Sequence, residues 1–109
     1  MTASNITSTD IAITDDTAKH RYEAHIGNEL AGYAEYNLLT DAIMFTHTEV
    51  LSAFEGKGVG STLAKHVLDD ARARKLHVIP VCQFIAAYIR KHLDYADLVR
   101  EDIQRAFKI

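Results

Sequence analysis

The sequence predicts an α/β or α+β domain: a mixed, mostly antiparallel sheet built from an N-terminal strand meander, followed by helix, strand and helix. Two observations predict it. Between residues 19 and 51 apolar and polar residues alternate with a period of two, and short turns interrupt the alternation. From Val59 onward the apolar residues instead recur every three to four positions, which is typical of an amphipathic helix.

Three strands account for the alternating region. We expect them at residues 19–26, 30–38 and 42–51, with Gly27-Asn28 as a two-residue hairpin turn and Thr40-Asp41 as the second turn. A short edge strand at residues 11–14 is expected to precede them. The order of these segments predicts antiparallel neighbours.

The helix after the meander is expected to run for about four turns. Val59, Leu63, Val67 and Ala71 form its apolar stripe, and a basic cluster at residues 72–75 marks its C-terminal end, where cations suit the helix dipole.

Residues 77–81 then read as a short strand. Pro80 has no N–H, so it requires an edge, a bulge or a break in pairing at that point. A second helix is expected at residues 83–92, with Phe84, Ala87 and Tyr88 in contact spacing, and a short last helix near residues 102–107.

The composition is that of an ordinary globular protein of 109 residues, with 48% hydrophobic and 25% charged residues. We expect a flexible tail at residues 1–10 and a single domain at residues 11–109. Residues 1–50 carry two basic and eight acidic side chains, net −6, and residues 51–109 carry ten and seven, net +3. The overall charge of −3 does not indicate nucleic-acid binding, but the C-terminal half suits an anionic ligand.

The single cysteine, Cys82, excludes an internal disulfide and a zinc-cysteine cluster. The first ten residues lack the basic and apolar regions of a secretory signal, and no apolar run is long enough to span a bilayer. We therefore expect a cytoplasmic protein without membrane association.

Alternating glycines at 56, 58 and 60 lie where strand-like sequence gives way to the first helix. Glycines there allow positive φ and close ligand approach, and the first helical turn offers free N–H groups to a phosphate. Lys57 is followed by Gly58 rather than by a hydroxyl residue, so a triphosphate loop is a poor match. The dinucleotide fingerprint also fails, because glycine is missing at Ser61 or Leu63.

The strand, G-x-G turn, amphipathic helix, short strand and tyrosine-bearing helix together resemble the acetyl-coenzyme A site of the GNAT superfamily of N-acetyltransferases. More narrowly, residues 55–62, 78–82, 86–92 and 95–99 resemble a small single-domain GNAT-like subfamily. The similarity runs from about residue 22 to residue 99.

The resemblance implies a cofactor site for acetyl-coenzyme A. Backbone amides of the turn and first helical residues hold the pyrophosphate, the preceding strand pairs with the pantetheine arm, and two central strands splay near Pro80 to admit the thioester. The implied residues are Val50, Leu51, Gly56, Lys57, Gly58, Val59, Gly60 and Ser61. Glu55 replaces the Gln or Arg that usually opens the motif, so we expect it to point away from the phosphates. The two N-terminal helices that form much of the acceptor pocket in longer members are missing.

Three residues are candidates for the chemistry. Cys82 is a nucleophile or an acid at the end of the short strand predicted at residues 77–81, or else a small buried hydrophobe. Tyr88 matches the tyrosine acid of the superfamily by spacing, or is an aromatic core contact. His47 is a general base, or a histidine on the strand surface. The remaining histidines are too scattered for a metal site, and we assign none.

The sequence thus favours an acetyl-coenzyme A-dependent N-acetyltransferase acting on an unidentified small-molecule or protein amine. The alternative is a non-catalytic coenzyme A-binding module with a regulatory or protein-interaction role. Nucleoside triphosphate binding ranks below both. The oligomeric state, monomer or homodimer, stays open.

Overall fold

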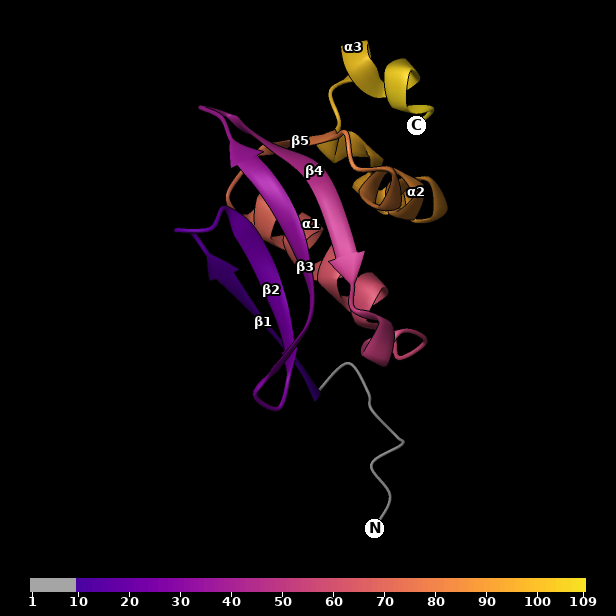
Figure 1. Ribbon diagram of the computed structural model, residues 1–109. Helices are drawn as coiled ribbons and strands as arrows, with labels where there is room; N and C mark the ends of the chain where they lie inside the picture. Colours follow the sequence, from indigo (N-terminus) through magenta and orange to yellow (C-terminus); the bar gives the residue numbers. More distant parts are fainter. Residues whose placement is uncertain (1–9) are drawn as a thin grey trace.

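The computed structural model describes residues 10–109, in which one five-stranded sheet has the order β1-β2-β3-β4-β5. The first four strands form an antiparallel meander, and β5 joins β4 in parallel (Figure 1). The strands are β1 Ile11–Asp16, β2 Arg21–Ile26, β3 Glu29–Leu38, β4 Ala42–Val50 and β5 His77–Pro80. The predicted mixed, mostly antiparallel sheet is confirmed. The expected tail falls almost entirely on residues 1–9, outside the described residues.

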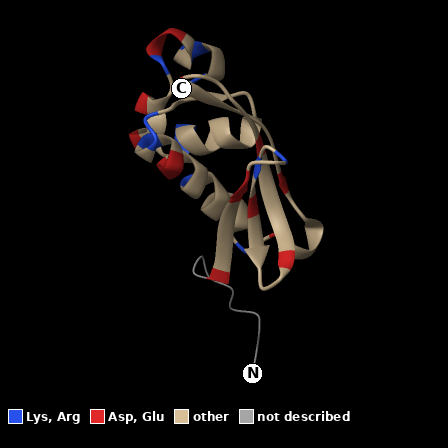
Figure 2. Ribbon diagram, turned by 90° about the vertical axis from the view of Figure 1, so that its left-hand side faces the viewer, with Lys and Arg blue, Asp and Glu red and all other residues tan. Residues whose placement is uncertain are grey.

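The helices follow the meander and cover one face of the sheet (Figure 2). The helical segments are η2 Ser52–Phe54, α1 Val59–Ala73, α2 Gln83–Lys91, η3 Leu93–Leu98, α3 Glu101–Gln104 and η4 Arg105–Phe107. The last helix expected from the sequence is therefore two consecutive short pieces, α3 and η4. No helix in residues 10–109 combines the length and apolar character that crossing a bilayer requires.

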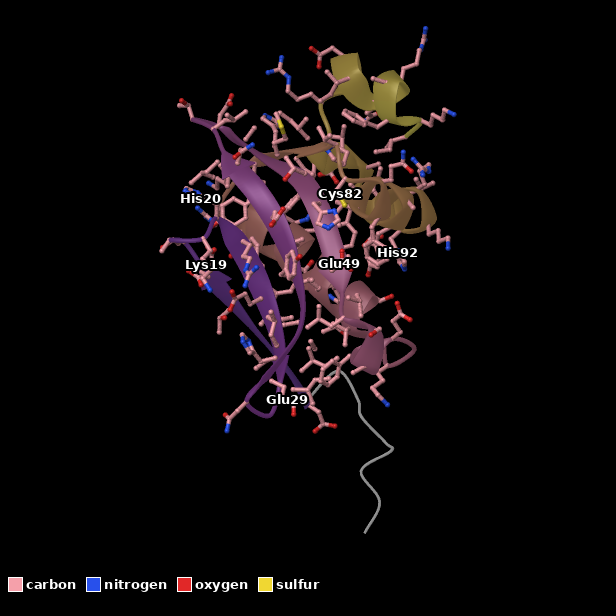
Figure 3. All side chains as sticks on the ribbon, viewed as in Figure 1. Lys19, His20, Glu29, Glu49, Cys82 and His92 are labelled. Atoms are coloured by element: carbon pink, nitrogen blue, oxygen red, sulfur yellow. The ribbon has the colours of Figure 1, made fainter. Side chains whose placement is uncertain are left out.

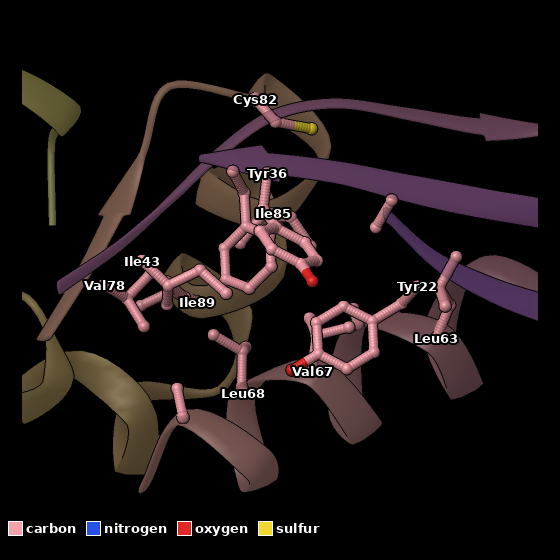
Figure 4. Close-up of a cluster of buried hydrophobic side chains, with 14 of the residues drawn as sticks. Tyr22, Tyr36, Ile43, Leu63, Val67, Leu68, Val78, Cys82, Ile85 and Ile89 are labelled. Carbon is pink, nitrogen blue, oxygen red and sulfur yellow. The ribbon is translucent and has the colours of Figure 1, made fainter. Parts of the chain in front are cut away.

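The core lies between the sheet and the helices α1 and α2 (Figure 4). The predicted stripe of α1, from Val59 to Ala71, is buried in it. The core-facing residues of α2 are Ile85, Ala86 and Ile89. Phe84 lies on another face of α2 and is 41% exposed, because the aliphatic stripe takes the inner face. Phe84 is therefore an exposed aromatic residue on a helix whose buried residues face the sheet.

A β-bulge at Thr46 decides which side chains of β4 face the helices. Glu35 pairs with His47 and Tyr36 with Phe45, so Thr46 is an extra residue without a register partner in β3. The bulge shifts the alternation along β4 by one position. Phe45 is buried before it, and Thr48 contacts the helix side after it.

Strands β4 and β5 stay together only at one end of the sheet. Their pairing runs from Ala42 opposite His77 to Phe45 opposite Pro80. The N–H of Cys82 then donates to the carbonyl of Phe45 at 2.7 Å, and β4 continues to Val50 with no register partner in β5. β5 is an edge strand and Pro80 is its last residue, which is one of the arrangements expected for this proline.

Three tyrosine–aspartate hydrogen bonds tie the elements together across long stretches of sequence. The hydroxyl of Tyr22 on β2 donates to Asp70 on α1. Tyr36 on β3 donates to Asp15 on β1, and Tyr95 in η3 donates to Asp69 on α1, each at 2.6 Å. Bonds to charged acceptors stabilise a fold more than neutral ones.

Replacing Tyr22 by Phe removes one of these bonds and leaves the ring in the core. Tyr22 is 1% exposed, so we expect a loss of about 1–2 kcal/mol in the free energy of unfolding, measured by urea denaturation. Tyr33→Phe is the matched control, since no hydrogen bond of its hydroxyl occurs within residues 10–109. Equal losses in the two variants would contradict the assignment.

Stability is also expected to fall at alkaline pH. Burial and the hydrogen bonds to Asp15 and Asp69 raise the pKa of Tyr36 and of Tyr95 from 10.0 to about 12. Between these values the unfolded chain loses phenolic protons that the folded chain keeps, so unfolding becomes more favourable as the pH rises. The stabilisation is complete below pH 10 and is lost as the pH rises through about 12. Urea midpoints across this range should decline less steeply for Tyr36→Phe than for the wild type.

Candidate functional site

The site begins where β4 ends and the chain turns into α1. After η2, Gly56 and Gly58 have φ of 79° and 81°, in the left-handed region that favours glycine. Gly58 is the N-cap of α1, and no side chain caps the helix. The first helical bond is from the N–H of Thr62 to the carbonyl of Gly58, at 3.0 Å. The N–H groups of the first turn therefore have no partner inside the helix and can bind an anion.

A pocket of about 250 Å³ opens in front of these N–H groups. We call it the turn pocket. Its lining residues are Val50, Phe54, Glu55, Gly56, Gly58, Val59, Gly60, Ser61 and Phe84. Six of the eight cofactor residues expected from the sequence thus meet in it, the exceptions being Leu51 and Lys57. The N–H of Leu51 is already bonded to the carbonyl of Ala31 at 2.9 Å.

Three residues of the turn pocket were not among the expected cofactor residues: Phe54, Glu55 and Phe84. Part of Glu55 lines the pocket, whereas we expected it to point away. Phe84 of α2 lies against Gly60, and a Cβ added there would come within 2.7 Å of the Phe84 ring. The absence of a side chain at Gly60 therefore lets the two helices approach at the pocket.

A second pocket, of about 230 Å³, adjoins the first and shares Ser61 and Phe84 with it. We call it the outer pocket; its other lining residues are Ala87, Tyr88, Lys91 and His92. The rings of Tyr88 and His92 stack at 4.0 Å, and Nδ1 of His92 lies 2.9 Å from the carbonyl oxygen of Tyr88. Lys91 contributes the only cationic side chain among the described residues that line either pocket, apart from His92 when it is protonated.

Cys82 lies at the point where β4 and β5 part (Figure 3). It is the N-cap of α2 and is 6% exposed. Its thiol donates a hydrogen bond to the hydroxyl of Thr48, with Sγ and Oγ1 3.2 Å apart. The thiol is thus buried beside the free edge of β4, and its hydrogen bond to Thr48 gives it a defined direction.

The other two candidates for chemistry lie elsewhere. The side chain of His47 is 52% exposed, and its Nε2 is 3.0 Å from Oε1 of Glu49. It lies on the face of β4 opposite to Thr48. Tyr88 is one turn and a half further along α2 than Cys82, and burial raises the pKa of its phenol, which stays protonated at neutral pH. Within residues 10–109 no recorded contact joins Cys82, Tyr88 and His47 to one another.

Comparisons with known proteins agree with this geometry. The family model of the GCN5-related N-acetyl-transferases matches residues 21–98. A search of solved structures finds the NMR solution structure of a GCN5-like protein from Staphylococcus aureus, with a TM-score of 0.64 and 24% sequence identity over 84% of this chain and 90% of that one. At this identity the likeness concerns the fold. The comparison with curated protein sequences gave no match.

The left-handed turn at Gly58 makes a direct prediction. An L-residue with a Cβ costs about 1–2 kcal/mol in this region, and asparagine tolerates it better than alanine. Gly58→Ala should therefore lower the free energy of unfolding by about 1 kcal/mol, and Gly58→Asn by less. No heavy atom lies within 4 Å of the added Cβ, so a clash does not confuse the comparison. Equal urea midpoints for wild type and Gly58→Ala would show that the turn adopts another conformation.

Proposed function

The chain belongs to the GCN5-related N-acetyl-transferase family, and on that premise we propose that it transfers the acetyl group of acetyl-coenzyme A to the amine of a small molecule or a protein. The observation that carries the proposal is the free edge of β4 leading into the turn pocket. Backbone groups beyond Phe45 have no partner in β5, and the free N–H groups at the start of α1 follow directly. An extended ligand with amide groups can pair with the free backbone groups of β4, and a phosphate at its end can bind the free N–H groups of α1.

In this proposal, backbone groups and side chains bind different parts of the coenzyme. The N–H groups of Gly58, Val59, Gly60 and Ser61 hold the pyrophosphate. The free edge of β4 up to Val50 pairs with the pantetheine arm. In the outer pocket, the ammonium of Lys91 neutralises a further phosphate of the coenzyme.

Acetyl-coenzyme A supplies the acetyl group as an activated thioester. The proposal assigns Cys82 to the reaction centre, because its thiol lies beside the free edge of β4 and is oriented by Thr48. Tyr88, with its proton retained at neutral pH, is the proposed acid for the leaving thiolate. His47 is proposed as the base for the amine only where an acceptor reaches the opposite face of β4, since that is the side on which it lies.

The coenzyme site is tested by thermal unfolding with acetyl-coenzyme A, coenzyme A and ATP. A ligand at a hundred times its dissociation constant stabilises the native state by about 2.7 kcal/mol, so both coenzymes should raise the midpoint by several degrees and ATP should not. Lys91→Gln should reduce the shift for coenzyme A more than for its form without the 3′-phosphate. Lys19→Gln, on the turn between β1 and β2 far from α2, is the charge-matched control (Figure 3). No shift with either coenzyme would refute the site.

Activity then separates an enzyme from a binding module. Release of free thiol from acetyl-coenzyme A across a panel of amines should exceed the rate in buffer for the wild type. Cys82→Ala should reduce that rate by about a hundredfold while keeping the thermal shift, since general acid or nucleophilic groups contribute on that order. A wild type that binds coenzyme and releases no thiol with any amine would favour the non-catalytic module.

A further inference from the structure

A third pocket lies on a different side of α2 from the turn pocket and the outer pocket. Its volume is about 300 Å³, within the size range of small-molecule sites. We call it the C-terminal pocket, because η4 closes one side of it. The lining residues are Pro80, Val81, Gln83, Ala86, Arg90, Ala106, Phe107 and Lys108. None of them lines the turn pocket or the outer pocket.

Three of the eight residues that line this pocket lie beyond the range that the family model matches. The family model ends at residue 98, whereas Ala106, Phe107 and Lys108 belong to the segment after it. That segment is fastened to α2 by Arg90, whose Nη1 donates to the carbonyl of Phe107 at 2.9 Å. The pocket therefore forms between the matched core, which supplies five lining residues, and the C-terminal segment, which supplies three.

The polar groups of the C-terminal pocket are donors without an acidic partner. Of residues 10–109, no carboxylate lies within ion-pair distance of Arg90 or Lys108. Arg90 uses one N–H on Phe107 and keeps its remaining donors, while the hydrogen bond fixes the guanidinium in place. Gln83 adds an amide, and Pro80, Val81, Ala86 and Phe107 supply apolar walls.

We propose that the C-terminal pocket binds a small organic carboxylate. The guanidinium of Arg90, which is bonded to Phe107, and the ammonium of Lys108 pair with the anionic end, since arginine and carboxylate match in geometry and charge. The apolar walls take a short hydrocarbon chain. Val81 and Gln83 flank Cys82 in the sequence, so a ligand in this pocket lies next to the turn that carries the proposed reactive thiol.

Three probes of equal chain length test the proposal in the absence of acetyl-coenzyme A: butyrate, 4-aminobutyrate and butylamine, at matched ionic strength. Backbone amide shifts in NMR titrations should move at Val81, Gln83, Ala86 and residues 106–108 with the two carboxylates and not with butylamine. Dissociation constants on the order of 1 mM are expected for ligands this small. Because no coenzyme is present, the outcome does not depend on the proposed acetyl transfer.

Variants assign the binding to the two cations. Arg90→Gln and Lys108→Gln should each weaken butyrate binding roughly fivefold or more, since each removes a charge-assisted bond. Arg105→Gln is the matched control, because Arg105 lies in the same η4 segment but does not line the pocket. Arg90→Gln also removes the bond to Phe107 and could detach the C-terminal segment. Lys108→Gln leaves that bond intact, so weaker butyrate binding by this variant reports the loss of the charge itself. Butyrate that binds no better than butylamine, or equally to all variants, would overturn the proposal.

The same three probes also show whether the bound carboxylate is the acceptor substrate or an effector. If the ligand is the acceptor, 4-aminobutyrate accelerates thiol release from acetyl-coenzyme A and butyrate competes with it. If the ligand is an effector, both carboxylates bind and neither is acetylated. Both results support a carboxylate site and differ only in its role.

Discussion

The arrangement of the site depends on the point at which β5 stops pairing with β4. Pro80 has no N–H to extend the ladder, and the chain turns away after one more hydrogen bond, from Cys82 to Phe45. That divergence leaves β4 with a free edge, starts α2 at Cys82, and aims the cysteine thiol at Thr48. A continuous ladder would have filled the place that the proposal gives to the pantetheine arm.

The groups that surround this opening are held by rigid elements. α1 is fixed to β2 through Tyr22 and Asp70, and η3 is fixed to α1 through Tyr95 and Asp69. Helix α2 packs its aliphatic face on the sheet and presents Phe84 to the first turn of α1. The turn between β4 and α1 is therefore enclosed on two sides by packed structure, although its glycines are intrinsically permissive.

Much of the fold follows from local patterns, because periodicity depends only on neighbouring residues. The strand alternation, the buried stripe of α1 and the limit that Pro80 sets on strand pairing are all of this kind. The bulge at Thr46 and the approach of Phe84 to Gly60 arise from contacts between distant segments, and no local signal announces them. The same is true of the bond from the N–H of Leu51 to the carbonyl of Ala31. From the motif alone, that N–H was expected to pair with the pantetheine arm. The cofactor residues remain a prediction until a coenzyme is bound.

The bulge in β4 has a consequence for how such a protein changes over evolutionary time. Because side chains alternate with a period of two, one extra residue exchanges the roles of every position after it. Because Thr46 is inserted before them, Thr48 and Val50 lie on the face of β4 toward the helices. For the same reason His47 and Glu49 lie on the opposite face. Loss or gain of one residue at this place would swap the two sets in a single step. An insertion or deletion of one residue here therefore changes the whole strand end at once, whereas a substitution changes one position.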